Sequence, residues 1–246
     1  LQEKLNRVKS HNDQTIIMVQ HLLFPWEGTK AHADWQSRFD EAWRKLSSAH
    51  DTVPGFYLYD EPMWRLEELQ KRADLTPITA ESYVAFANEL GQIANYIKQK
   101  TGKLTSLTEA YPAIDAGRPL VTAVDWIGFN CYRAYGNVCS AARIRDLFSW
   151  MLQNKGTQQK MMITADSYWN TAPGEAAENA VVARIELWKE LVARHAGEVA
   201  AVTPFLYQNH TLEKLWGAQA MPRALQALKA WSEQLLGAKC APQPAL

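Results

Sequence analysis

The chain has 246 residues, a length that fits one large α/β domain or two small ones. Lysine plus arginine and aspartate plus glutamate both number 26, so no net positive field favours nucleic acid as a partner. Hydrophobic residues make up 47% of the chain, enough for a sizeable core, but no apolar run approaches the roughly 20 residues that a membrane span needs.

Apolar runs typical of strands alternate along the chain with amphipathic patterns typical of helices. The expected strands, in chain order, are 15–24, 56–61, 104–111, 124–132, 160–169 and 199–207. The expected helices are 34–49, 79–100, 141–154, 175–195 and 222–236. Because most of these strands are continuous apolar runs, they predict a parallel sheet that is covered by helices.

Six strands fit either a doubly wound sheet or a (β/α)8 barrel. No strand is followed by a Gly-x-Gly-x-x-Gly turn or by a phosphate-loop lysine motif. Each strand instead ends in polar or aromatic residues, whereas a doubly wound sheet concentrates its site at one switch point. We therefore predict an α/β fold of the (β/α)8 TIM-type barrel class that lacks its first β-α-β unit. A single domain is expected over 1–238, followed by a disordered tail at 239–246.

The strand at 56–61 ends in two adjacent carboxylates. Its apolar and aromatic residues have strand composition, and Asp60 and Glu61 follow them directly. Pro62 cannot donate to a sheet, so the strand is expected to end where the acids lie. In barrel enzymes the carboxyl ends of the strands carry the chemistry. Two adjacent acids in a partly dry site repel each other, which raises the pKa of one and suits it to act as a general acid.

Aromatic and amide side chains follow most of the other strands. Ten tryptophans and nine tyrosines provide flat apolar surfaces, and pyranose rings are one partner for such surfaces. Amides suit hydroxyl-rich ligands because they both donate and accept hydrogen bonds. The predicted substrate-binding residues at or just beyond the strand ends are Trp26, Trp64, Glu109, Tyr111, Asn130, Tyr132, Trp169, Tyr207 and Asn209.

Two of these motifs resemble those of the retaining (β/α)8 glycoside hydrolases. The sequence Asp60-Glu61-Pro62 is similar to the Asn-Glu-Pro motif that carries the acid/base glutamate at the end of the fourth barrel strand. Residues 125–132 (DWIGFNCY) are similar to the sixth strand of the β-glucosidase branch. The resemblance implies cleavage of glycosidic bonds in an oligo- or polysaccharide, with Glu61 as general acid/base and no cofactor.

The predicted seventh barrel strand departs from that pattern. The family pattern is Ile-Thr-Glu-Asn, whereas residues 163–166 read Ile-Thr-Ala-Asp, so Ala165 stands where the nucleophile is expected. Asp166 follows one residue later, and a one-residue shift turns a strand side chain to the other face of the sheet. Asp166 is therefore a candidate nucleophile, base or substrate ligand if the strand bulges or ends early.

Three alternatives remain open at this point. The Asp60–Glu61 pair also resembles that of substrate-assisted hexosaminidases, in which Asp orients the 2-acetamido group and Glu protonates the leaving oxygen. Ala165 at the nucleophile position leaves open a carbohydrate-binding barrel without catalysis. Metal-assisted hydrolysis would need histidines and carboxylates from several strands, and we expect no metal site.

Cysteine content and the N-terminus bear on location. Cys131 and Cys139 lie eight residues apart, a spacing that allows a small disulfide, and Cys240 is left over. No Cys-x-x-Cys or Cys/His cluster predicts structural zinc. The chain shows no signal peptide and does not begin with methionine, so we expect a processed or truncated product and favour an extracellular or periplasmic location. The oligomeric state stays open.

Overall fold

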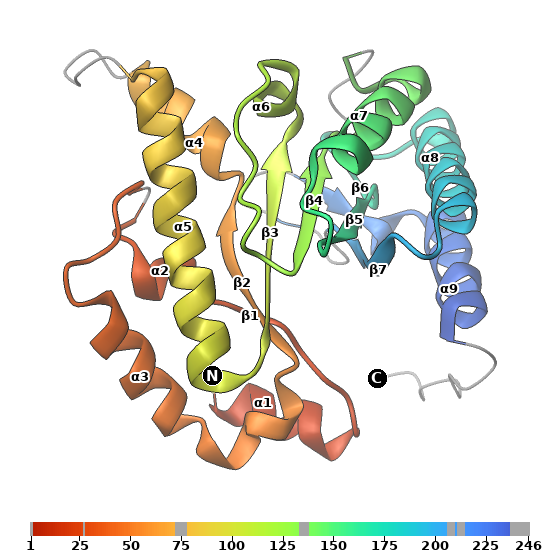
Figure 1. Ribbon diagram of the computed structural model, residues 1–246. Coiled ribbons are helices and arrows are strands. Elements are labelled where there is room, and N and C mark those ends of the chain that lie inside the picture. The colour runs from red at the N-terminus through yellow and green to blue at the C-terminus, as the bar shows by residue number, and fades with distance from the viewer. Residues whose placement is uncertain are drawn as a thin grey trace. The chain divides into compact units, whose positions relative to one another are not determined.

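The computed structural model describes residues 2–26, 28–71, 78–132, 138–205, 210 and 215–236. Figure 1 shows its helices and strands along the chain. The strands are β1 (Ile17–Met18), β2 (Gly55–Asp60), β3 (Leu104–Ala110), β4 (Trp126–Asn130), β5 (Lys160–Ala165), β6 (Tyr168–Trp169), β7 (Val199–Pro204) and β8 (Trp216–Gly217). The helices are α1 (Gln2–Ser10), α2 (Gln20–Leu23), α3 (Trp35–Lys45), α4 (Pro62–Gln70), α5 (Ala80–Thr101), α6 (Tyr111–Asp115), α7 (Ala141–Asn154), α8 (Glu175–Arg194) and α9 (Pro222–Leu236). The predicted tail lies outside the described residues.

The chain forms two compact units. The first contains 1–130 and 150–162, and its strands run in the order β1-β2-β3-β4-β5, each parallel to its neighbour. The second contains 131–149 and 163–246, where β7 lies beside the end of β5 and β6 pairs antiparallel with β8. Six parallel strands with flanking helices confirm the predicted α/β class.

The core of the first unit is built on one face of β2. Phe56 and Tyr59 are buried and meet Phe39 and Phe24 edge to face, at 5.2 and 5.0 Å between ring centroids. Figure 1 shows α3 and α5 along the same side of β2. Fully burying one such ring stabilises the fold by about 1.5–3 kcal/mol. These aromatic contacts therefore fix β2 against its helices.

Helix boundaries follow the end signals in the sequence. Thr79 and Ser82 form a capping box at the start of α5, and Gly102 closes that helix in the left-handed conformation at φ 68°. The helices α7 and α9 begin and end at the predicted residues. For these three helices the residues at the ends match the signals in the sequence.

Two predicted strands are interrupted before their expected ends. The run 15–24 contains only the two-residue β1, because the Leu23 and Phe24 N–H groups bond to the carbonyls of Val19 and Gln20 and form the short helix α2. The run 160–169 ends as β5 at Ala165, and its last two residues form β6, which belongs to a separate antiparallel pair. Both interruptions lie at the carboxyl end of a strand, next to a candidate functional residue.

Cys131 and Cys139 form the disulfide that their spacing allows, with their Cα atoms 5.4 Å apart. Within the described ranges, no helix combines the length and apolar character required to cross a bilayer.

Candidate active site

The strand β2 is irregular just before its two carboxylates. Tyr57 lies opposite Ser106 of β3. Asp60 then lies opposite Thr108, so three steps along β2 match two steps along β3 and the strand bulges. A regular strand would point Tyr57 and Asp60 to opposite faces. The bulge brings them together, and the Tyr57 hydroxyl donates a hydrogen bond to Asp60 Oδ1 at 2.7 Å.

Asp60 is fixed at both its backbone and its side chain. Its N–H donates to Oε1 of the buried Gln20, the first residue of α2, at 3.0 Å. Burial raises the pKa of its carboxyl, while the hydrogen bond from Tyr57 and the more distant charge of Arg65 act in the opposite direction. Sequence reasoning missed Tyr57 as the partner of Asp60, because strand alternation alone places the two side chains on different faces.

Glu61 has a left-handed backbone, with φ 54° and ψ 52°, which is uncommon for a residue other than glycine. Its N–H donates to the carbonyl of Thr108 at 2.7 Å. Its side chain is half-buried, and Oε1 accepts a hydrogen bond from Asn130 Nδ2 at 2.9 Å. Backbone and side chain are therefore tied to β3 and β4, and these ties define where the carboxyl group lies.

No described cation neutralises Glu61 directly. Arg65, one helical turn further on, forms no ion pair with Glu61 and instead lies over the ring of Trp64, 5.2 Å from its centroid. Burial, followed by repulsion from Asp60, raises the pKa of Glu61 from 4.5 to about 7, against smaller opposing effects of Asn130 and Arg65. A carboxyl with a pKa near neutrality can give up and take back a proton under physiological conditions, which is what general acid/base chemistry requires.

Glu109 is more deeply buried than Glu61. It is 1% exposed, and Oε2 accepts a hydrogen bond from the N–H of Met63 in the first turn of α4 at 3.3 Å. Burial raises the pKa of Glu109 well above its usual range, with Glu61 and Asp60 adding to the effect. A side chain enclosed in this way is poorly placed to contact a sugar.

Asp166 lies in the second unit and is also 1% exposed. Its Oδ2 is 3.7 Å from Arg184 Nε and accepts a hydrogen bond from Trp188 Nε1 at 3.3 Å. Both partners belong to α8. Arg184 also donates to the carbonyl of Cys139, which belongs to the disulfide. The carboxylate of Asp166 is thus engaged by a buried guanidinium and an indole of one helix.

The other predicted site residues differ widely in exposure. Trp26 is 78% exposed and stacks on His21, with 4.7 Å between ring centroids. Trp64, Tyr111 and Trp169 are half-buried. Tyr132 is buried against Tyr168 and Phe205 in the core of the second unit. Tyr207 and Asn209 lie outside the described residues. Among the described residues, no group of three or more His, Cys, Asp or Glu side chains has the arrangement needed to hold a metal ion.

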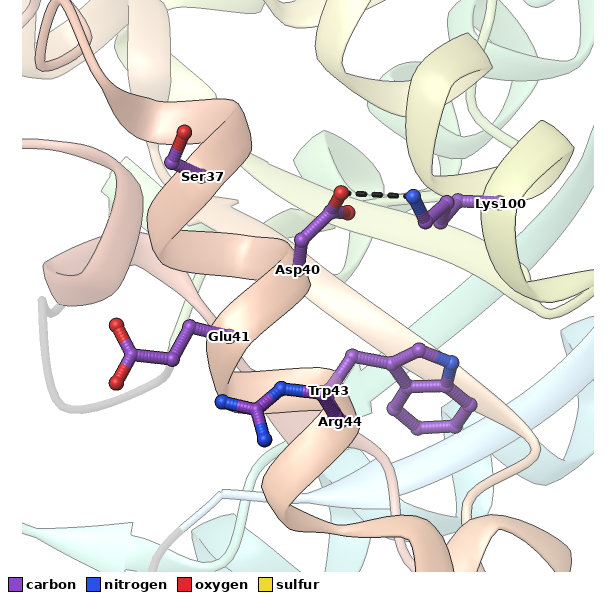
Figure 2. A pocket seen from close by; sticks show the side chains of 6 residues that line it. All are labelled: Ser37, Asp40, Glu41, Trp43, Arg44 and Lys100. Atoms are coloured by element: carbon purple, nitrogen blue, oxygen red, sulfur yellow. Dashed lines mark hydrogen bonds and ion pairs between the residues drawn. The ribbon is translucent and has the colours of Figure 1, made fainter.

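A hollow of about 450 Å³ lies elsewhere on the first unit, between α3 and the end of α5 (Figure 2). Asp40 accepts hydrogen bonds there from Lys100 Nζ at 2.7 Å and from the Tyr96 hydroxyl at 2.9 Å. The lining residues are Ser37, Asp40, Glu41, Trp43, Arg44 and Lys100. Lys100 lies just before β3 begins, whereas the carboxylates lie at the carboxyl ends of β2 and β3, so the hollow is separate from the candidate active site.

No family model and no curated protein matches the sequence. Solved structures do match its fold. Ruminococcus gnavus β-glucuronidase aligns with a TM-score of 0.56 at 9% identity, over 94% of this chain and 42% of that chain. The xylanase XynB from Paenibacillus barcinonensis aligns with a TM-score of 0.53 at 13% identity, over 87% of this chain and 75% of that chain. A GH113 β-1,4-mannanase aligns with a TM-score of 0.54 at 12% identity, over 94% of this chain and 77% of that chain.

These neighbours define the class of the fold. The chain has the fold of the (β/α)8-barrel glycoside hydrolases, as its sequence predicted, and its six parallel strands correspond to part of the eight-stranded barrel. The chain spans 22% of the length of a Bacteroides uniformis β-glucuronidase. At these identities the likeness is one of fold, so activity has to be argued from the site itself.

Proposed function

We propose that this protein hydrolyses glycosidic bonds and that Glu61 is the general acid. The observation that carries the proposal is the state of Glu61: it follows a barrel strand, is half-buried without an ion pair, and has a pKa raised to about 7. Below that pH Glu61 holds a proton that it can pass to the oxygen of the departing sugar as the glycosidic bond breaks. Asn130 orients the carboxyl for this transfer.

The second half of the reaction needs a group that stabilises the anomeric carbon. Asp166 is a poor candidate, because Arg184 and Trp188 already engage its buried carboxylate. Asp60 is adjacent to Glu61 and is held by Tyr57, which favours the substrate-assisted route. In that route the carbonyl oxygen of a 2-acetamido group bonds to the anomeric carbon while the glycosidic bond breaks and Glu61 protonates the leaving oxygen.

The resulting oxazolinium ion is then opened by water. Glu61, now a carboxylate, takes a proton from that water. At the same time the water oxygen bonds to the anomeric carbon, the bond from the acetamido oxygen to that carbon breaks, and the acetamide is regenerated. Asp60 would accept a hydrogen bond from the acetamide N–H and balance the positive charge of the oxazolinium ion. This route assigns the chain a substrate that contains 2-acetamido sugars, and it needs no nucleophile at Ala165.

Aromatic side chains near the strand ends would bind the sugar rings. Trp26 offers the most accessible surface, and its stacking on His21 restricts its orientation. Trp64, Tyr111 and Trp169 retain partial exposure, whereas the burial of Tyr132 favours a packing role. The Cys131–Cys139 disulfide is in keeping with an extracellular or periplasmic location, where such bonds persist.

The test is a panel of aryl β-glycosides with and without a 2-acetamido group. We expect hydrolysis of the 2-acetamido-2-deoxyglucoside and loss of that activity in Glu61→Gln, while Glu68→Gln further along α4 retains it. Hydrolysis of the xyloside, mannoside or glucuronide instead would overturn the acetamido route and leave Glu61 as the acid. Sugar binding without any turnover would replace the hydrolase by a binding barrel.

A further inference from the structure

We infer that Glu109 is a positioning residue for Glu61: its side chain anchors the first turn of α4 and thereby fixes the left-handed backbone that aims the Glu61 carboxyl. The inference rests on the proposed role of Glu61 as general acid. Glu109 itself is buried and touches no substrate in this assignment, so its effect on the reaction is indirect.

The first turn of α4 lacks the usual source of a cap. Glu61 occupies the N-cap position but makes no side-chain hydrogen bond to the helix, and Pro62 has no N–H to offer. The next N–H, that of Met63, is buried and needs an acceptor. Glu109 Oε2 supplies it at 3.3 Å. A side chain from β3 therefore does for α4 what an N-cap residue does in most helices.

Glu61 is consequently held from both sides by two successive residues of β3. Its own N–H donates to the carbonyl of Thr108 at 2.7 Å, and the N–H two residues later donates to Glu109. A left-handed backbone at a residue other than glycine is strained and persists only where its surroundings enforce it. The two tethers provide that enforcement.

The protonation state of Glu109 fits this task. Because Glu109 is buried and lies near the charges of Glu61 and Asp60, its pKa is raised well above its usual range, which favours the protonated, neutral form. A neutral acid still offers its carbonyl oxygen to the N–H of Met63. It adds no negative charge beside the pair at the end of β2, so it can hold the helix without further perturbing Glu61.

Two variants separate this role from others. Glu109→Gln keeps a neutral acceptor of the same shape, whereas Glu109→Leu removes the acceptor and keeps an apolar volume. We expect Glu109→Gln to retain kcat within about threefold, with the fall of activity at high pH unmoved. We expect Glu109→Leu to lower kcat by about 10- to 100-fold with KM changed less than threefold, because a misaimed acid weakens proton transfer. Glu109→Met replaces Glu109→Leu if the latter does not fold.

A backbone readout makes the test independent of the reaction. The crystal structures of the apolar variants are expected to have lost the left-handed φ at Glu61, and that of Glu109→Gln to have kept it. An unchanged φ in the apolar variants, or equal loss of kcat in Glu109→Gln, would overturn the positioning role. If the wild type hydrolyses no glycoside, or Glu61→Gln is fully active, the proposed function fails, while the φ measurement still decides the anchoring of α4.

Discussion

Two carboxylate sites follow strands of this fold, and they differ in how their buried charge is treated. In the second unit, Asp166 lies 3.7 Å from the Arg184 guanidinium and accepts a hydrogen bond from Trp188. In the first unit, Asp60 and Glu61 are adjacent, repel each other and have no ion-pair partner among the described residues. One acid is paired with a cation, and the other two share their burial with another acid.

The comparison indicates which kind of burial allows a carboxyl group to exchange protons. A buried carboxylate that faces a guanidinium belongs to a structural pair, since removing one member leaves an uncompensated charge. A partly buried carboxyl beside a second one has its pKa raised towards neutrality, so it can exchange protons. Burial alone therefore does not favour proton exchange here; partial burial beside a second acid does.

The largest effect is expected from Glu61→Gln. Removing the proton donor should lower the rate of glycoside hydrolysis by about 10²- to 10⁴-fold. Because folding raises the pKa of Glu61 from 4.5 to about 7, ionisation of this group opposes folding, and wild-type stability falls as the pH rises through that range. Glutamine does not ionise, so the variant should be more stable than wild type at pH 8 by on the order of 2 kcal/mol, and equally stable at pH 4.

Initial rates and urea denaturation at the two pH values measure both effects. The half-buried carboxylate of Glu68, which is on the same helix and pairs with Lys71, provides the control through Glu68→Gln. A Glu61→Gln protein that is slower but less stable at pH 8 would mean that the ionised carboxylate, not the acid, is the form that the fold holds.

At Asp166 we expect a substitution to lower the stability of the fold, in contrast to Glu61→Gln. The Asp166→Ala substitution leaves Arg184 buried without this carboxylate and should lower the free energy of unfolding by about 3–5 kcal/mol. The double variant Asp166→Leu with Arg184→Met, which removes both charges, should recover most of that loss. Chemical denaturation of the three proteins makes the comparison. Wild-type stability combined with a complete loss of activity in Asp166→Ala would instead identify Asp166 as a reacting group.

Much of the frame was predictable because it depends on local patterns. The alternation of apolar runs and amphipathic segments gave the α/β class, and the capping signals gave the bounds of α7 and α9. The Asp60-Glu61-Pro62 sequence located the acids at the end of β2, since proline ends a strand. The place of Glu61 in the fold followed from its own neighbours in sequence.

What failed depended on contacts between distant segments or on a single extra residue. The bulge between Tyr57 and Asp60 reverses the strand alternation, so their pairing was not visible in the sequence. The partner of Asp166 lies 18 residues further along the chain, in the middle of α8. Glu109 ends a strand as expected, but whether it faces a ligand or a helix depends on the packing of α4, which no local pattern encodes.

The pH dependence tests the repulsion within the acidic pair. For wild type, kcat/KM should fall tenfold per pH unit above about pH 7, as Glu61 loses its proton. The charge of Asp60 raises the pKa of Glu61, so Asp60→Asn should move this fall to lower pH. Tyr57→Phe removes a hydrogen bond that favours ionised Asp60 and should move the fall in the same direction by a smaller amount. Profiles that coincide in all three proteins would show that Asp60 does not act on the catalytic acid.

The smallest effect is expected from Trp26→Ala, which addresses binding alone. A sugar ring stacked on the exposed indole gains on the order of 1 kcal/mol, so its loss should raise KM about three- to tenfold and leave kcat unchanged. Stability should change by less than about 0.5 kcal/mol, because the side chain is 78% exposed. Trp216 on β8, which is 36% exposed, offers a matched control through Trp216→Ala. If KM rises equally in both variants, Trp26 has no special place in substrate binding. If it rises only in Trp26→Ala, the substrate reaches the loop after β1 while its scissile bond lies at the end of β2, which would place sugar binding and the acidic pair within the same unit.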